Sequence, residues 1–165
     1  MKPKVLIVMG SDSDLSVMKK SAEILDDFAI PYHMTVASAH RTPERTRKIV
    51  KEAEKNGTEV IIAGAGMAAH LPGVVASYTV LPVIGVPIDS SSLNGIDALL
   101  SIVQMPPGIP VAAMSVGKAG AKNAALLAVQ ILSRKDRKLA GKLLEHRQRM
   151  SEEVEIKAKK LRKKQ

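Results

Sequence analysis

Val5-Leu6-Ile7-Val8-Met9-Gly10-Ser11-Asp12-Ser13-Asp14 places five consecutive apolar residues directly before a polar turn. A run that is apolar at every position is typical of a strand buried on both faces of a parallel sheet. The turn residues favour a helix N-terminus, and apolar residues at helical spacing follow from Leu15. This stretch therefore predicts a β-α unit at the start of the chain.

The same strand-then-helix pattern recurs four more times along the sequence. We expect strands at 5–9, 32–37, 60–63, 82–86 and 111–116, and the helices after the first at 43–56, 67–77, 96–103 and 120–132. Short apolar strands that alternate with helices pair in parallel through right-handed crossovers. The expected fold is a three-layer, doubly wound α/β fold with the flavodoxin-like strand order 2-1-3-4-5 and a C-terminal amphipathic helix.

The length of 165 residues predicts one catalytic domain over residues 1–134, followed by a basic amphipathic helix or tail at 135–165. The chain has no cysteine, which excludes disulfides, a thiol nucleophile and thiolate metal sites. No segment resembles a signal peptide or a membrane span, so we expect a cytoplasmic protein without a membrane partner.

The formal net charge of +9 is concentrated at one end of the chain. Residues 134–165 carry 13 Lys/Arg and 5 Asp/Glu, whereas the preceding residues are almost neutral. The tail also has no aromatic residues for stacking on bases, which favours a solvated helix over a nucleic-acid-binding arm. Its apolar stripe, expected to pack on the body or on another subunit, comprises Leu139, Leu143, Met150, Val154 and Leu161.

Three polar turns follow the first three predicted strands, at residues 10–14, 38–43 and 64–70. In the expected strand order these strands are neighbours, and ligands bind beyond their carboxyl ends at the switch point between strands 1 and 3. The three turns are therefore expected to form one site.

The first turn offers Ser11 and Asp14. The Ser11 hydroxyl and the N–H groups of a helix start suit an anion, and the Asp14 carboxylate suits sugar hydroxyls. The alternative is that Asp12, Ser13 and Asp14 only cap the helix start, without any ligand.

The second turn, Ser38-Ala39-His40-Arg41-Thr42-Pro43, combines a hydroxyl, an imidazole and a guanidinium. Arg41 can hold a phosphate through two N–H groups, and we expect Ser38 to contribute to the same site. His40 is the best candidate for a general acid–base because its ordinary pKa lies near neutrality. The alternative is a loop histidine bonded only to the backbone.

The third turn, Gly64-Ala65-Gly66-Met67-Ala68-Ala69, matches the dinucleotide pattern G-x-G-x-x-A. It follows the third strand rather than the first, and the chain has little room for a second domain, so NAD or FAD binding is disfavoured. The same glycines let backbone N–H groups approach a planar or carboxylate ligand. His70 either faces this pocket or is structural. His40 and His70 lack metal-ligand spacing, so we expect no metal.

Five motifs in order resemble the PurE family, the N5-carboxyaminoimidazole ribonucleotide mutases of purine biosynthesis. They are Gly10–Asp14, Ser38–Pro43, residues 63–73, Pro82–Pro87 and Ser101–Pro106. The resemblance spans residues 4–132 and implies a cofactor-free isomerisation in which a carboxylate moves from N5 to C4 of the imidazole, with a phosphorylated imidazole ribonucleotide as substrate. The alternative is the related branch that carboxylates aminoimidazole ribonucleotide with free CO2, but Arg41, where that branch tends to carry Lys, favours the mutase branch.

The resemblance also implies roles for individual residues. Ser11, Asp14 and Arg41 would hold the phosphate and ribose, and His40 would be the general acid–base. The backbone of Gly64, Ala65 and Gly66 would line a closed cavity for CO2, with His70 and Leu71 as further pocket residues. Met67 stands where the family often carries a smaller residue, which predicts a narrower pocket. Family members form octamers, so we expect a homo-octamer.

Overall fold

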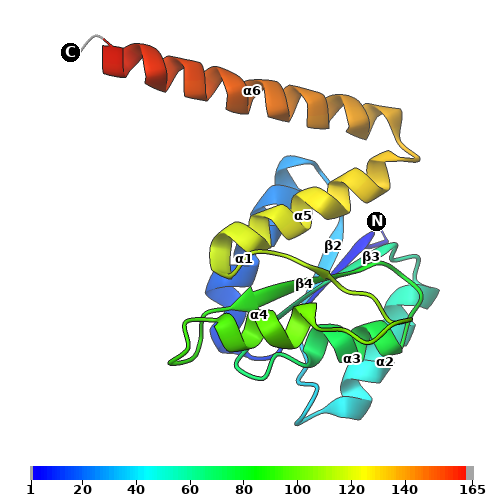
Figure 1. Ribbon diagram of the computed structural model, residues 1–165. Helices are drawn as coiled ribbons and strands as arrows, with labels where there is room; N and C mark the ends of the chain where they lie inside the picture. Colours follow the sequence, from blue (N-terminus) through cyan, green and yellow to red (C-terminus); the bar gives the residue numbers. More distant parts are fainter. Residues whose placement is uncertain (1, 163–165) are drawn as a thin grey trace. The chain divides into compact units, whose positions relative to one another are not determined.

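Five parallel strands form one sheet in the order β2-β1-β3-β4-β5 (Figure 1). The computed structural model describes residues 2–162 and places the strands at β1 (Val5–Met9), β2 (Tyr32–Val36), β3 (Val60–Gly66), β4 (Val83–Ile88) and β5 (Ala112–Ala113). Met9, at the end of β1, pairs with Val36 of β2 on one side and Gly64 of β3 on the other. The predicted α/β fold and strand order are confirmed, and the three central turns start at one edge of the sheet.

The helices follow the strands as the sequence predicts. They are a 3-10 turn (Asp12–Asp14), α1 (Leu15–Asp27), α2 (Pro43–Lys55), α3 (Leu71–Ser77), α4 (Ile96–Val103), α5 (Gly117–Ser133) and α6 (Arg137–Arg162). Pro43 occupies the first turn of α2, where its missing N–H needs no partner. Gly57 has a φ of +90° directly after α2, which is the backbone conformation that ends many helices.

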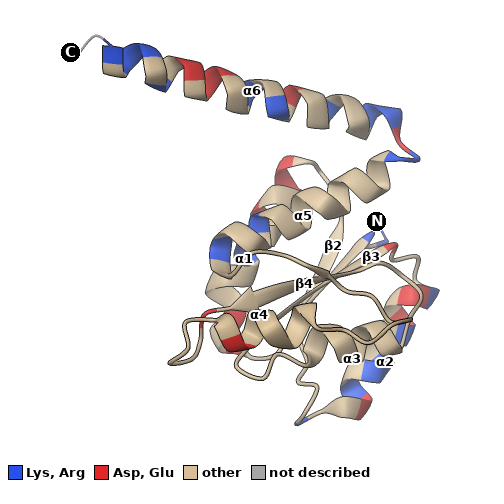
Figure 2. Ribbon diagram, viewed as in Figure 1, with Lys and Arg blue, Asp and Glu red and all other residues tan. Residues whose placement is uncertain are grey.

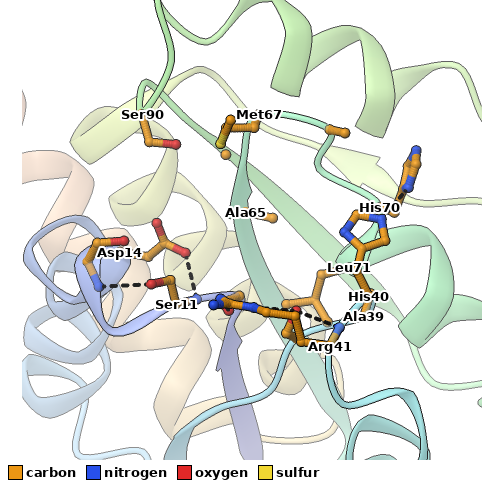
Figure 3. Close-up of a pocket in the computed structure, with 15 residues that line it drawn as sticks. Ser11, Asp14, Ala39, His40, Arg41, Ala65, Met67, His70, Leu71 and Ser90 are labelled. Carbon is orange, nitrogen blue, oxygen red and sulfur yellow. Dashed lines mark hydrogen bonds between the residues drawn. The ribbon is translucent and has the colours of Figure 1, made fainter.

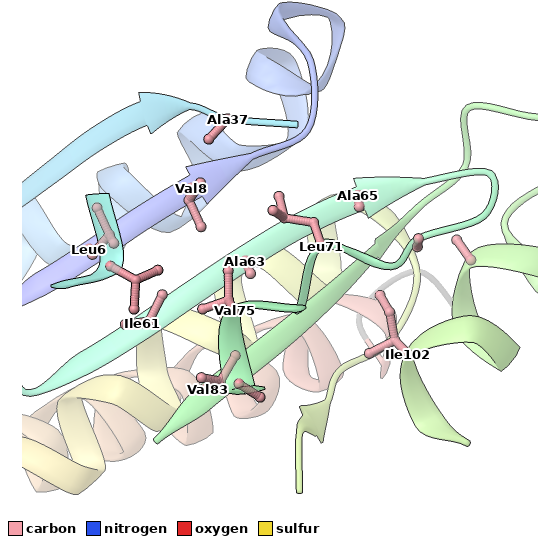
Figure 4. Close-up of a cluster of buried hydrophobic side chains, with 14 residues drawn as sticks. Leu6, Val8, Ala37, Ile61, Ala63, Ala65, Leu71, Val75, Val83 and Ile102 are labelled. Atoms are coloured by element: carbon pink, nitrogen blue, oxygen red, sulfur yellow. The ribbon is translucent and has the colours of Figure 1, made fainter. Parts of the chain in front are cut away.

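The core lies on both faces of the sheet because side chains alternate along each strand. Leu6 and Val8 of β1 join a buried cluster with β3 and with α2, α3 and α4 (Figure 4). On the opposite face, the buried Ser21 of α1 donates a 2.7 Å hydrogen bond from Oγ to the carbonyl of Ala121 in α5. The strands are thus covered by aliphatic side chains on each face, in agreement with the very low aromatic content.

Several element boundaries differ from the prediction. The fifth strand is restricted to Ala112–Ala113 instead of spanning 111–116. The third strand extends to Gly66, and α3 begins at Leu71 rather than at residue 67. Met67 has a φ of +54°, which is incompatible with a right-handed helix, so residues 67–70 form a separate turn.

Close packing at Gly85 of β4 leads to a stability prediction. A Cβ added at Gly85 would lie 2.5 Å from Ile102 Cγ2 and 3.0 Å from Val111 Cγ1. We expect Gly85→Ala to lower the free energy of unfolding by about 1–3 kcal/mol through overpacking, measured by urea denaturation.

Gly141 in α6 provides the matched control, because nothing lies within 4 Å of a Cβ added there. Gly141→Ala is expected to raise helix stability by about 0.5–1 kcal/mol. A Gly85→Ala protein as stable as the wild type would contradict the packing described for β4.

The chain divides into two compact units, Met1–Ala128 and Val129–Gln165. In the second, the Asp136 carboxylate accepts hydrogen bonds from the backbone N–H groups of Lys138 and Leu139 and so caps α6. Along the predicted apolar stripe, Leu139 and Leu143 are buried, whereas Met150, Val154 and Leu161 are exposed. Basic residues recur along α6 (Figure 2). The boundary at residue 134 stays a prediction.

Within residues 2–162, no helix combines the length and apolar character that crossing a membrane requires.

Candidate active site

A pocket of about 550 Å³ lies where the turns after β1, β2 and β3 meet (Figure 3). This volume falls within the range of small-molecule sites. The predicted site residues that line it are Ser11, Asp14, Ser38, His40, Arg41, Ala65, Gly66, His70 and Leu71. The convergence expected from the strand order is thus present in the structure.

Hydrogen bonds join the three turns in pairs. The Gly10 N–H donates to the Gly64 carbonyl at 3.1 Å, which ties the first turn to the third. The Arg41 guanidinium donates from Nη2 to the Gly10 carbonyl at 3.4 Å, which ties the second turn to the first. His40 Nε2 lies 2.7 Å from His70 Nδ1 and ties the second turn to the third. The pocket walls therefore hold one another in place.

The first turn is a capping box that also faces the pocket. The Ser11 side chain accepts a hydrogen bond from the backbone N–H of Ser13, and Asp14 Oδ2 accepts one from the Ser11 N–H at 3.1 Å. Asp14 is only 4% exposed, and burial is the main cause that raises the pKa of its carboxyl, opposed by hydrogen bonds from the backbone of Ser11 and Gly10. Capping and pocket lining, which the sequence presents as alternatives, are combined here.

The second turn is closed by its own hydroxyl groups. The Ser38 N–H donates to Thr42 Oγ1 at 3.0 Å, and that hydroxyl donates back to the Ser38 carbonyl at 3.1 Å. The Arg41 backbone N–H donates to Ser38 Oγ at 3.2 Å, so the Ser38 hydroxyl is held beside the guanidinium. Among residues 2–162, no carboxylate forms an ion pair with Arg41. Its positive charge is therefore available to an anionic ligand.

His40 and His70 form a pair of imidazoles at one side of the pocket (Figure 3). Their ring centroids lie 4.9 Å apart, and the ring planes meet at 77°. Because a 2.7 Å separation of two ring nitrogens requires a hydrogen between them, one nitrogen donates and the other accepts. Both histidines line the pocket, so His40 is not a loop histidine bonded only to backbone.

Gly64 and Gly66 in the third turn have different surroundings. Gly64 is not among the residues that line the pocket, and a Cβ added there would collide with Met18 of α1. Gly66 does line the pocket, and a Cβ added there would collide with the Ser90 side chain. Glycine is needed at both positions for close packing, on the core side at Gly64 and on the pocket side at Gly66.

Met67, expected from the sequence to narrow the pocket, lines it, and five further lining residues were not selected from the sequence: Gly10, Ser13, Ala39, Ala68 and Ser90. All but Ser90 belong to the three turns already identified, but the sequence does not show which residues of a turn face the pocket. Ser90 follows β4, which is the next strand beside β3. A polar residue just after a fourth neighbouring strand was the signal that could have identified it.

In the part of the chain that the structure describes, no three or more His, Cys, Asp or Glu residues are placed so that they could hold a metal ion. His40 and His70 are each other's partners.

The raised pKa of Asp14 predicts how stability depends on pH. Burial raises the folded-state pKa of the Asp14 carboxyl above its ordinary value of 3.8, so the stability that the carboxyl contributes is fully present below about pH 3.8 and is lost as the pH rises through the folded pKa. Asp14→Asn cannot ionise and avoids this loss. We expect urea denaturation to show the variant gaining stability relative to the wild type as the pH rises above about 3.8. A difference that is constant with pH would contradict the burial effect.

Comparison with known proteins identifies close relatives. The AIR carboxylase family matches residues 4–153. The chain is 61% identical over 160 residues to the N5-carboxyaminoimidazole ribonucleotide mutase of Pyrococcus horikoshii, covering 97% of this chain and 89% of the relative. It is 53% identical over 151 residues to the mutase of the same name from Escherichia coli K12, covering 92% of this chain and 89% of the relative.

A solved structure agrees with these sequence matches. Treponema denticola PurE superposes with a TM-score of 0.87 at 33% identity, covering 96% of this chain and 98% of that protein. The family match extends beyond residue 132, where the resemblance carried by the sequence motifs ends, into α6. On sequence and on fold, the chain belongs to the AIR carboxylase family.

Proposed function

We propose that this protein converts N5-carboxyaminoimidazole ribonucleotide into 4-carboxyaminoimidazole ribonucleotide, the reaction for which its curated relatives are named. The observation that carries the proposal is the pocket itself. It combines the Arg41 cation, which forms no ion pair with a carboxylate of residues 2–162, with the His40–His70 pair at the junction of three turns. A phosphate-binding cation and a proton-transfer group are the two features that this isomerisation requires.

The phosphate and ribose would be held by the first two turns. The Arg41 guanidinium and the Ser38 hydroxyl beside it suit the phosphate oxygens, together with the Ser11 hydroxyl. The buried Asp14 carboxylate suits the ribose hydroxyl groups as a hydrogen-bond acceptor. With these groups placed, the imidazole lies toward β3 and the histidine pair.

The chemistry conserves all atoms. The bond between N5 and the carboxylate carbon breaks, CO2 is released within the pocket, and N5 gains a proton from His40. C4 of the ring then attacks CO2 to form the new carbon–carbon bond, and the C4 proton passes to His40, which restores its protonation state. The 2.7 Å contact with His70 supports this role, because it holds the His40 ring in one orientation and can supply or accept the shared proton.

Recapture of CO2 requires a small apolar space beside the reacting ring. Ala39, Ala65 and Leu71 contribute methyl and isobutyl groups to the pocket wall, and Gly66 leaves backbone exposed to it. An apolar wall retains CO2 close to C4 without offering it a competing nucleophile.

Product analysis tests the proposed activity. The purified protein is incubated with N5-carboxyaminoimidazole ribonucleotide in the absence of ATP and added metal, and the C4-carboxylated product is measured. In parallel, aminoimidazole ribonucleotide and bicarbonate are supplied to test the carboxylase alternative. Fast conversion of the first substrate and slow conversion of the second supports the mutase, and the reverse result establishes the carboxylase.

We also propose that the protein acts in the cytoplasm as a homo-octamer with residues 1–134 as its catalytic domain. An exposed apolar stripe supports assembly, because α4 and the loop before it present Leu93, Ile96, Leu100 and Val103 on the surface. Analytical ultracentrifugation should give a mass eight times the 17.7 kDa of one chain. A monomeric mass would reject the octamer.

A further inference from the structure

Met67 adopts a backbone conformation that costs free energy for any residue with a Cβ. Its φ is +54°, in the left-handed region. Two other non-glycine residues between 2 and 162 share this feature, and each has a local explanation. Ala29 follows the end of α1 and donates its N–H to the Asp26 carbonyl, while Asn94 is a residue type that tolerates this region.

The Met67 side chain adds a second unfavourable feature. It is 61% exposed, although it is a large apolar group directly after Gly66, the last residue of β3. A glycine at this position would avoid both the strained φ and the exposed apolar surface. Strain of this kind at a pocket points to a functional role for the side chain.

The position of Met67 indicates which part of a ligand it can reach. Met67 lines the pocket beside Ser90, and Figure 3 shows both across the pocket from Arg41. The phosphate is assigned to Arg41 and the ribose to Asp14, so the wall that includes Met67 remains for the base. A thioether is polarizable and packs favourably on aromatic rings.

We propose that Met67 is a positioning residue whose side chain packs on the imidazole ring of the bound ribonucleotide and sets the affinity for the base. The inference rests on the proposed function, because it takes the ligand to be an imidazole ribonucleotide. Ligand binding then covers the exposed side chain, which explains why this position carries an apolar group at the pocket rim.

Steady-state kinetics with three substitutions test the role. Met67→Ala retains a Cβ and removes the thioether, and we expect KM to rise about three- to tenfold, with the loss in KM rather than in kcat. Met67→Leu keeps apolar bulk and is expected to give a smaller rise. Met67→Gly should raise KM as Met67→Ala does but also raise the melting temperature by roughly 2–4 °C, because it relieves the strained φ.

Two controls separate contact with the base from other effects. Ribose 5-phosphate lacks the base, so its inhibition constant should be the same for Met67→Ala as for the wild type. Ala29→Gly relieves a similar φ outside the pocket and should leave KM unchanged. An unchanged KM for Met67→Ala, or an equal loss of affinity for ribose 5-phosphate, overturns the role of Met67. A wild-type protein without turnover instead overturns the proposed function itself.

Discussion

Turnover by the His40→Asn variant is expected to fall by about two to four orders of magnitude, because general acid–base catalysis typically contributes that much. Asparagine keeps a polar side chain of similar reach but cannot exchange a proton near neutral pH. Binding of the ribonucleotide should persist, since Arg41 and Asp14 line other parts of the pocket. Rates come from product formation under saturating substrate, and affinity comes from calorimetry with the C4-carboxylated product.

His33 provides the matched control for this substitution. It is exposed on β2 and does not line the pocket. His33→Asn should therefore retain the wild-type rate. If the His40→Asn variant also turned over at a near-normal rate, His40 would not be the general acid–base, and His70 would be the next candidate for that role.

Arg41→Ala is the second substitution with a large expected effect. Hydrogen bonds to charged groups contribute about 1.5–3 kcal/mol, so we expect KM to rise about 10- to 150-fold. The KM of Arg41→Lys should lie between those of the wild type and Arg41→Ala, because lysine retains the charge but not the planar arrangement of N–H donors. Initial rates over a range of substrate concentrations measure the effect.

Arg47→Ala is the control for Arg41→Ala, because Arg47 is an exposed arginine of α2 that does not line the pocket. It removes the same charge from the same part of the chain and should leave KM unchanged. Equal increases in KM for both variants would mean that general electrostatic attraction, rather than a contact at Arg41, holds the phosphate.

The fold could be predicted from the sequence because its strands are continuously apolar and its helices are marked by caps. The run Val5–Met9 is buried at every position, as its composition indicates. The short fifth strand could not be predicted, because Val111–Val116 is as apolar as a strand and only its pairing with β4 limits it to two residues. The start of α3 was also missed, since the φ of Met67 is not visible in the residue pattern.

The sequence predicts that three turns form the candidate site, but it does not predict which residues of these turns face the pocket. Ser11, His40 and Arg41 line the pocket because turns at the same edge of a parallel sheet face one space. Gly64, one residue before Ala65 on β3, packs against Met18 of α1 and does not line the pocket. Ala65 and Gly66, the last two residues of β3, both line the pocket, so the alternation of side chains along a strand does not by itself predict which residues face the ligand.

The contact between His40 and His70 has no signal in the sequence. Thirty positions separate the two residues, and each belongs to a different turn. Only the order β2-β1-β3 brings these turns to one edge, and only the side-chain conformations bring the two ring nitrogens together. Pairing of this kind depends on packing rather than on any local pattern.

Gly10 bonds to both neighbouring turns, through its N–H to Gly64 and through its carbonyl to Arg41. Separating the Gly10 N–H from Gly64 means separating β1 from β3, two central strands of the sheet, so the Gly10 amide should exchange its hydrogen for deuterium only through global unfolding. The link between the first and third turns should therefore be lost together with the sheet and not in a separate transition. A core substitution such as Gly85→Ala should reduce the fraction of folded molecules while each folded molecule keeps the full rate of the wild type.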